Sequence, residues 1–329
     1  MSNPYLVIAP EIFIVGGAGF IGSHFVDTLL TNSDIKRVTV FDNFSSGKRW
    51  HLQQWISDSR LKIVEADVRD LNSLSNAMSG HGVVIHLASN PNIAAATTTP
   101  AVDFDQGTLL THCVAEAARI AGVHTVLYAS GSGVYGDIGE TEATEDFGPL
   151  IPVSTYAASK LAGEALLSAY AHMFGSRAIA FRFGNVVGPR QTHGVGYDFV
   201  RRLRDNPTQL PILGDGKQSK SYVFVGDIVK SVLLASHKSD VPFEVFNVAT
   251  DDFISVTEIA TIACEVSGLN ADSVRFEYSG GDRGWKGDVP VVRLSSAKIR
   301  SLGWQQTMNS SESLSFSMRE MLRDSRTFS

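Results

Sequence analysis

Short apolar runs alternate with longer segments of helical periodicity along the first 190 residues. The runs are rich in Val, Ile and Phe, as expected for strands that are buried on both faces of a parallel sheet. This alternation predicts an α/β fold with a Rossmann-type doubly wound parallel sheet and ligands at the carboxyl ends of the strands. We expect strands at 12–15, 37–41, 61–65, 83–86, 125–130 and 178–182, and helices near 25–30, 70–78, 103–120 and 156–172.

Beyond residue 190 the alternation weakens, because the chain is divided into short pieces by Pro207, Pro211, Gly214 and Gly216. Two strand-like segments and two helices are expected there, at 221–225, 243–248, 228–236 and 255–267. The pattern predicts a smaller C-terminal α/β lobe that closes over the strand ends. We therefore expect a nucleotide-binding domain at 1–190, with part of its sheet completed later in the chain, and a substrate lobe mainly at 191–329.

A glycine-rich turn follows the first predicted strand and opens the first helix, with Gly16, Gly17, Gly19 and Gly22. Glycines permit a tight turn and the close approach of a pyrophosphate, which the helix N-terminus attracts. Asp42 ends the second strand, 20 residues after Gly22, where an acid bonds a ribose 2′-hydroxyl and repels a 2′-phosphate. The arrangement predicts NAD as the cofactor rather than NADP, with its adenine near Asp67 and Val68.

A tyrosine and a lysine share one face of the helix predicted at 156–172. Ser154 suits the N-cap of this helix, and Tyr156 and Lys160 follow four residues apart. A cation beside a phenol favours the phenolate, which makes the tyrosine a candidate base near neutral pH. His86, at the end of the fourth strand, is interpreted as a buried structural histidine rather than a functional one.

The composition excludes several other classes of protein. The chain has 329 residues, 43% of them hydrophobic and 19% charged, and a net charge of −6 without long basic runs, which argues against nucleic acid and anionic membranes as partners. Cys113 and Cys264 have no disulfide or metal-site spacing, which favours a cytoplasmic location and no bound metal. The apolar N-terminus is interrupted by Pro10 and Glu11, so neither a signal peptide nor a membrane span is expected.

Two helices are apolar or small on more faces than one sheet can cover. The helices at 103–120 and 156–172 each carry such residues nearly all round. We expect them to form the helix-bundle interface of a homodimer. Deep burial within one chain is the alternative.

The motifs in their order resemble the extended short-chain dehydrogenase/reductase family, and within it the NAD-dependent nucleotide-sugar epimerases and dehydratases typified by UDP-galactose 4-epimerase. The resemblance spans residues 11–305. It rests on Gly16 to Gly22, Asp42-Asn43, Asp67-Val68, His86-Leu87-Ala88, Val134-Tyr135-Gly136, Tyr156 with Lys160, Arg182 to Pro189, Gly214-Asp215-Gly216 and Gly287 to Pro290.

The resemblance implies tightly bound NAD and a C-terminal lobe for a nucleoside-diphosphate sugar. In such enzymes the tyrosine takes a proton from a sugar hydroxyl, usually at C4, as hydride passes to the nicotinamide, and the lysine bonds the nicotinamide ribose. The resemblance assigns to NAD the residues Gly16, Gly19, Phe20, Ile21, Gly22, Asp42, Asn43, Ser45, Ser46, Gly47, Asp67, Val68, Leu87, Ala88, Ser130, Tyr156 and Lys160. It assigns to the sugar nucleotide Ser132, Tyr156, Asn185, Lys220 and Arg283.

One position departs from the family pattern and bears on the reaction. The family usually has a catalytic Ser or Thr where this chain has Gly131, so we expect Ser132 to supply the hydroxyl, with Ser130 as the second candidate. Related 4,6-dehydratases carry Asp-Glu next and decarboxylases a Glu, whereas this chain has Ser132-Gly133. The 3,5-epimerases use a Cys/Lys pair, and neither cysteine is suitably placed.

The resemblance thus implies an isomerase, a UDP-glucose/UDP-galactose 4-epimerase that passes through a 4-keto intermediate. A nucleotide-sugar 4-ketoreductase or another sugar-modifying member is the alternative within the fold, although net reductases usually draw on NADPH. A non-catalytic NAD-binding sensor or scaffold is the alternative from another class. Relatives that act on glucuronate often carry Arg where this chain has Thr192, and glucose-restricted relatives carry Tyr where it has Val292, so N-acetylated sugars also remain candidates. Further cations suited to a diphosphate are Arg190 and Lys286.

Overall fold

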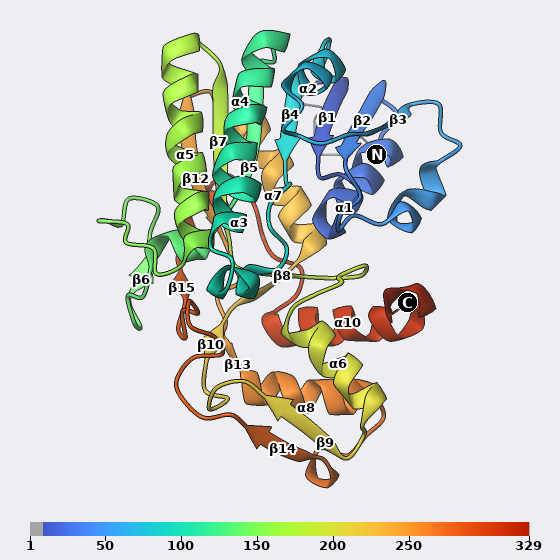
Figure 1. Cartoon of the computed structure of the whole chain (residues 1–329), viewed down its shortest axis with the longest axis vertical. Coiled ribbons are helices and arrows are strands. Elements are labelled where there is room, and N and C mark those ends of the chain that lie inside the picture. Colours follow the sequence, from blue (N-terminus) through green and yellow to red (C-terminus); the bar gives the residue numbers. More distant parts are fainter. Residues whose placement is uncertain (1–8, 329) are drawn as a thin grey trace.

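The computed structural model describes residues 9–328. Its centre is a parallel sheet of seven strands in the order β12-β7-β5-β4-β1-β2-β3, which confirms the predicted doubly wound fold (Figure 1). Strand order reverses between β1 and β4, where a crevice opens at the carboxyl ends of such sheets. The strands are β1 (Glu11–Val15), β2 (Arg37–Asp42), β3 (Leu61–Glu65), β4 (Val83–His86), β5 (Thr125–Gly131), β7 (Arg177–Phe183) and β12 (Phe243–Val248).

Helices cover both faces of the sheet. Because side chains alternate along a strand, Ile12 and Ile14 join one apolar core while Phe13 and Val15 join the other. The first core includes residues of α1 (Phe20–Thr31) and α7 (Val225–Lys238). The second includes residues of α2 (Leu71–Met78), α4 (Leu109–Ala121) and α5 (Thr155–Phe174).

The helix expected at 103–120 is continuous but not uniform. It starts as α3 (Ala101–Asp103), widens into a π-helical turn at Phe104–Thr108 and continues as α4. A Cβ on Gly107, inside the wide turn, would lie 2.3 Å from the Ser159 hydroxyl of α5. The widened turn and its glycine therefore let α5 pack closely, a local effect that apolar periodicity does not reveal.

Helix α5 is also pressed against β5. It begins at the N-cap Ser154, whose hydroxyl accepts a hydrogen bond from the Ala157 amide at 3.2 Å, as the sequence predicted. A Cβ on Gly163 would lie 2.4 Å from the Tyr128 hydroxyl of β5. This glycine brings the helix near enough for its buried side chains to reach the backbone of β5.

The smaller lobe is built around a separate apolar core. This core includes residues of α6 (Val195–Asp205), α8 (Val256–Val266) and α10 (Ser310–Arg323). Short strand pairs complete it and join it to the sheet: β8 (Asn185–Val187) with β11 (Tyr222–Phe224), β9 (Gln209–Ile212) with β14 (Arg275–Tyr278), β10 (Ser219–Lys220) with β13 (Ile254–Ser255), and β6 (Glu142–Ala143) with β15 (Arg293–Leu294). The edge strand β12 comes from beyond residue 190, so the main sheet draws on both parts of the chain.

Within residues 9–328, no helix is long and apolar enough to cross a membrane. Cys113 and Cys264 are buried free thiols. The prediction that the chain has no signal peptide concerns chiefly residues 1–8, which lie outside the described residues.

Candidate active site

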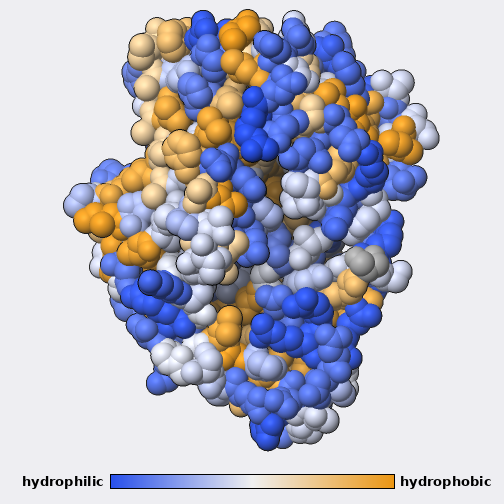
Figure 2. Space-filling view, viewed as in Figure 1, coloured by the Kyte–Doolittle hydropathy of each residue, from blue (hydrophilic) through white to orange (hydrophobic). Residues whose placement is uncertain are grey.

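A cavity of about 930 Å³ lies at the carboxyl ends of the strands, between the sheet and the smaller lobe. The space-filling view shows the surface recessed between these two parts (Figure 2). The volume is at the upper end of the range for small-molecule sites. Such a cavity has room for a cofactor and a substrate together.

One end of the cavity is built by the glycine-rich turn and the ends of β2, β3 and β4. All the residues predicted to bind NAD line the cavity except Gly47. A Cβ on Gly47 would fall 2.8 Å from a carboxylate oxygen of Asp42, so this glycine allows its loop to pack against that side chain. Asp67 is held by Arg69, whose hydrogen bonds lower the pKa of the carboxyl to about 2.

The turn itself fits the diphosphate of a dinucleotide. Gly16 has φ of 81°, and a Cβ there would lie 2.8 Å from the Ala88 amide nitrogen. The helix α1 begins directly afterwards, with its N-terminal amides near the cavity. The carboxylate of Asp42 accepts hydrogen bonds from the amides of Ala18 at 2.9 Å and Phe44 at 2.8 Å, while burial raises its pKa. The turn and the acid therefore form one rigid unit.

Tyr156 and Lys160 both line the cavity. Lys160 is 3% exposed, and its ammonium donates to the Ala129 carbonyl at 2.8 Å and lies 5.5 Å from the Tyr156 ring centre. Burial acts to lower the pKa of Lys160, but the neighbouring Tyr156 and Tyr128 phenols outweigh it, and the pKa is raised. A charged lysine therefore faces a half-buried tyrosine that lines the cavity.

The two candidate serines differ in their contacts. Ser130 is 5% exposed, and its hydroxyl donates to the Glu164 carboxylate at 2.5 Å. Ser132 lines the cavity, and its hydroxyl has no hydrogen-bond partner among the described residues. The hydroxyl of Ser132 is therefore the one that remains available to a ligand.

We predict that Ser132→Ala lowers kcat by about 10²-fold, because one aligned hydrogen bond to the reacting oxygen is lost. Adding Gly131→Ser to that variant should restore much of the activity. Gly131 has an extended backbone, with φ of −160°, and a Cβ there meets no atom within 4 Å. Steady-state kinetics of the single and double variants check both statements. Unchanged turnover in Ser132→Ala would exclude Ser132 from catalysis.

The residues predicted for the sugar nucleotide are not all brought together. Asn185 lines the cavity and donates to the Ser221 carbonyl at 3.2 Å, and Lys220 also lines it, paired with Asp288 at 2.5 Å. Arg283 does not line the cavity. Its guanidinium instead bonds Asp137 and, at 2.6 Å, the backbone carbonyl of Asp288.

The two further cations lie elsewhere. Arg190 is not among the cavity-lining residues, because its guanidinium pairs with Asp27 and bonds the His51 carbonyl at 3.0 Å. Lys286 is exposed and does not line the cavity. Among the four proposed cations, Lys220 is thus the one at the cavity wall.

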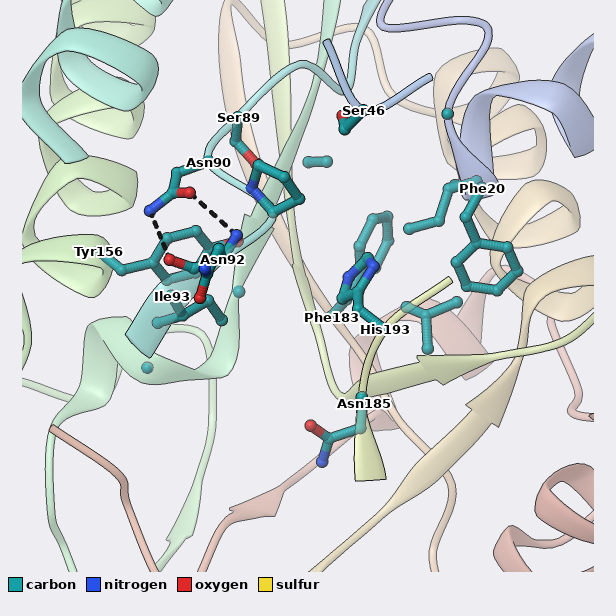
Figure 3. Close-up of a pocket in the computed structure, with 18 of the residues that line it drawn as sticks. Phe20, Ser46, Ser89, Asn90, Asn92, Ile93, Tyr156, Phe183, Asn185 and His193 are labelled. Atoms are coloured by element: carbon teal, nitrogen blue, oxygen red, sulfur yellow. Dashed lines mark hydrogen bonds between the residues drawn. The ribbon is translucent and has the colours of Figure 1, made fainter. Parts of the chain in front are cut away.

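Several residues that line the cavity were not predicted as site residues from the sequence. Asn92, Phe183, His193 and Trp285 all line the cavity, and Phe183 and His193 point into it in the close-up (Figure 3). Trp285 lies in the loop that ends in the recognised Gly287-Asp288 motif, which was its available signal. The polar Asn90-Pro91-Asn92 stretch, which begins four residues after the end of β4, was the signal for Asn92.

A buried carboxylate joins the asparagine loop to the start of α5. Asp103 is 1% exposed and accepts hydrogen bonds from Asn90 at 2.8 Å and from Thr155 at 2.7 Å. Thr155 directly precedes Tyr156. The loop after β4 is therefore joined through Asp103 to Thr155, the residue before the candidate base.

His86 does not line the cavity. Its Nε2 contacts the Thr111 hydroxyl at 3.1 Å, and burial, aided by the Lys160 charge, lowers its pKa to about 3. The imidazole stays neutral in the core. This placement agrees with its interpretation as a structural residue.

The glycine-rich turn, the acid that ends β2 and the Tyr–Lys pair, with space for a second ligand beside them, define a class of dinucleotide-dependent enzymes. Residues 12–249 match the model of the NAD dependent epimerase/dehydratase family. The chain belongs to this family, and NAD is its cofactor.

Two similar proteins are named as UDP-glucose 4-epimerases. The chain is 33% identical over 300 residues to a UDP-glucose 4-epimerase of Mycolicibacterium smegmatis, covering 89% of this chain and 92% of the relative. It is 30% identical over 323 residues to a putative UDP-glucose 4-epimerase of Methanocaldococcus jannaschii, covering 96% and 100%.

Two similar solved structures carry different activities in their names. A UDP-galactose 4-epimerase is 38% identical, with a TM-score of 0.84 over 95% of this chain and 99% of that one. A dTDP-glucose 4,6-dehydratase double mutant from Streptomyces venezuelae with NAD bound is 29% identical, with a TM-score of 0.87 over 96% and 97%. Membership of the family therefore does not distinguish an epimerase from a dehydratase, and the residues of the site must do so.

Proposed function

We propose that this protein is a NAD-dependent 4-epimerase of a UDP-hexose, with UDP-glucose and UDP-galactose as its substrates. The observation that carries the proposal is the set of carboxylates in the cavity wall. Among the described residues these are Asp42, Asp67, Asp198 and Asp288, and none belongs to the Ser130–Tyr135 segment beside Tyr156.

Elimination of water needs one group to remove a proton and another to protonate the leaving hydroxyl. Three of these carboxylates are already engaged. Asp42 accepts hydrogen bonds from two backbone amides, Asp67 forms an ion pair with Arg69, and Asp288 forms an ion pair with Lys220. Asp198 lies on α6, in the smaller lobe, and is paired with Arg201 at 3.6 Å. The residues after Gly131 supply neither an acid nor a base, which favours epimerisation over dehydration.

In the proposed epimerisation, Tyr156, Lys160 and Ser132 have different roles. Tyr156 accepts the proton of the sugar 4-hydroxyl as the C4 carbonyl forms, and it returns the proton to that oxygen as the opposite epimer forms. Lys160 stabilises the phenolate and would bond the ribose of bound NAD, while Ser132 would hold the sugar oxygen. Bound NAD supplies the acceptor of hydride from C4 and its donor in the return step. The sugar turns over between the two steps, so the cofactor is regenerated in each cycle.

Incubation of the purified protein with UDP-galactose, without added cofactor, tests the proposal. We expect catalytic formation of UDP-glucose, because NAD is regenerated and remains bound. A dehydratase would instead form a keto product lighter by one water. A 4-ketoreductase would accumulate nothing without reduced cofactor, and a scaffold would leave the sugar unchanged.

The same assay with N-acetylated substrates defines the sugar. Val292 lines the cavity, and a larger side chain at this position would occupy part of the cavity volume. This room supports acceptance of UDP-N-acetylgalactosamine as well as UDP-galactose.

We also propose that the protein forms a homodimer through α4 and α5. These helices lie side by side at one edge of the molecule (Figure 1). Large apolar side chains remain exposed on or next to them: Phe104, Ile120, Ile151, Met173 and Phe174. Sedimentation equilibrium of the purified protein gives the oligomeric state, and a monomer would contradict the proposal.

A further inference from the structure

A buried ion pair lies directly behind the Tyr–Lys pair, on the same face of α5. Tyr156, Lys160 and Glu164 are spaced four residues apart and so follow one another along that face. Lys160 donates to the carbonyl of Ala129 at 2.8 Å, and Glu164 accepts from the hydroxyl of Ser130 at 2.5 Å. Two consecutive turns of α5 thus hold two consecutive residues of β5.

Arg182 completes the pair from the neighbouring strand. It stands opposite Ser130 in the register of β5 and β7. Its guanidinium bonds both oxygens of Glu164, at 3.0 and 2.7 Å, and the hydroxyl of Tyr135 at 2.8 Å. Tyr135 ends the 3-10 turn that begins at Ser132, so the network encloses the whole segment that carries the proposed catalytic hydroxyl.

The Glu164–Arg182 ion pair is buried, and its polar atoms have hydrogen-bond partners. Glu164 and Arg182 are each 4% exposed, and no side-chain atom of either is buried without a partner. Buried ion pairs of this kind are often no more stabilising than apolar residues of similar volume, because both charges must be desolvated. Stability alone is therefore a weak account of two charges at this position.

The charges of Glu164 and Arg182 affect the electrostatic environment of the Lys160 ammonium. The groups that face its ammonium are Tyr156 and Glu164 of α5, Tyr128 of β5 and His86 of β4. An unpaired Glu164 carboxylate would attract this ammonium and disfavour a phenolate at Tyr156. Arg182 neutralises that carboxylate, and Glu164 in turn holds the pKa of the guanidinium above its usual range against the effect of burial.

We propose that Glu164 and Arg182 are positioning residues of the active site. They fix the Ser130–Tyr135 segment against α5 and keep Lys160 directed at Tyr156. This inference rests on the proposed function, in which Tyr156 is the base. It adds two residues that never touch the substrate and that act through the charge and the placement of others.

Opposite charge changes provide the test. Glu164→Gln removes the negative charge, so the acid limb of the kcat profile against pH should move to lower pH by up to about 1 unit. Arg182→Met leaves the carboxylate uncompensated, so the limb should move to higher pH by a similar amount. The double variant carries neither charge, and its limb should return close to that of the wild type.

Asp227→Asn is the matched control. Asp227 is a fully buried carboxylate of α7 that accepts hydrogen bonds from Thr307, and among the described residues it makes no contact with Lys160. This variant should lower the melting temperature without moving the acid limb. If Glu164→Gln and Arg182→Met also lose only stability, or shift the limb in the same direction, the pair is merely structural and the inference is wrong.

A second readout separates this inference from the proposed function. Tyrosinate absorbance across a pH titration, taken as the difference from Tyr156→Phe, reports ionisation of Tyr156 without turnover. Opposite shifts of that midpoint in the two variants support the ion-pair role even for a protein that fails to convert UDP-galactose. Equal midpoints in all variants overturn it even for an active epimerase.

Discussion

Replacing Tyr156 with phenylalanine should lower kcat for UDP-galactose by about 10²- to 10⁴-fold, the usual contribution of a positioned acid–base group. The ring keeps its place 5.5 Å from the Lys160 ammonium, so folding and NAD retention should be unchanged. Steady-state kinetics, together with the NAD content of the purified variant, check the prediction.

Tyr128→Phe provides the matched control. Tyr128 also lies near Lys160, at 5.2 Å, but it is 1% exposed and does not line the cavity. Its hydroxyl is buried away from the cavity, so removing it should lower kcat far less than removing the Tyr156 hydroxyl. Comparable losses in the two variants, or full activity in Tyr156→Phe, would contradict the role of Tyr156 as the base.

The second large effect is expected for Gly22→Ala. A Cβ there would lie 2.4 Å from the Gly16 carbonyl oxygen and 2.7 Å from the Gly17 Cα, both backbone atoms of the turn that is predicted to bind the diphosphate. Relieving this overlap must move the turn away from α1, at a cost of about 1–3 kcal/mol in the free energy of unfolding. We expect a lower melting temperature and loss of co-purifying NAD.

Gly131→Ala controls for the loss of a glycine as such. Its added Cβ meets no atom within 4 Å, so the melting temperature and the NAD content should stay near those of the wild type. A Gly22→Ala protein that retains NAD and melts normally would show that the turn can relax without losing its function.

Much of the fold followed from local patterns. The strands predicted at 61–65, 83–86 and 243–248 have the observed bounds, because each is a short run rich in β-branched or aromatic residues. The π-helical turn at Phe104–Thr108 was not predicted, since it depends on the contact of Gly107 with Ser159 in another helix.

The candidate site was predictable where its residues are neighbours in the chain. The turn from Gly16 to Gly22, Asp42, and the Tyr156–Lys160 spacing all lie at the cavity, because short segments next to strand ends carry them. The cations were less predictable. Whether an arginine meets a ligand or a carboxylate depends on distant residues, as for Arg190 with Asp27 and Arg283 with Asp137.

The sequence by itself determined the alternation of strands and helices, the glycine-rich turn, the preference for NAD and the pairing of Tyr156 with Lys160. Each depends on periodicity or spacing within one segment. Tertiary structure alone decided that Ser130 is engaged by Glu164 while Ser132 is available, and that Arg182 neutralises Glu164 behind the lysine. These outcomes depend on contacts between residues 18 to 34 positions apart, which only the packing of α5 against β5 and β7 brings together.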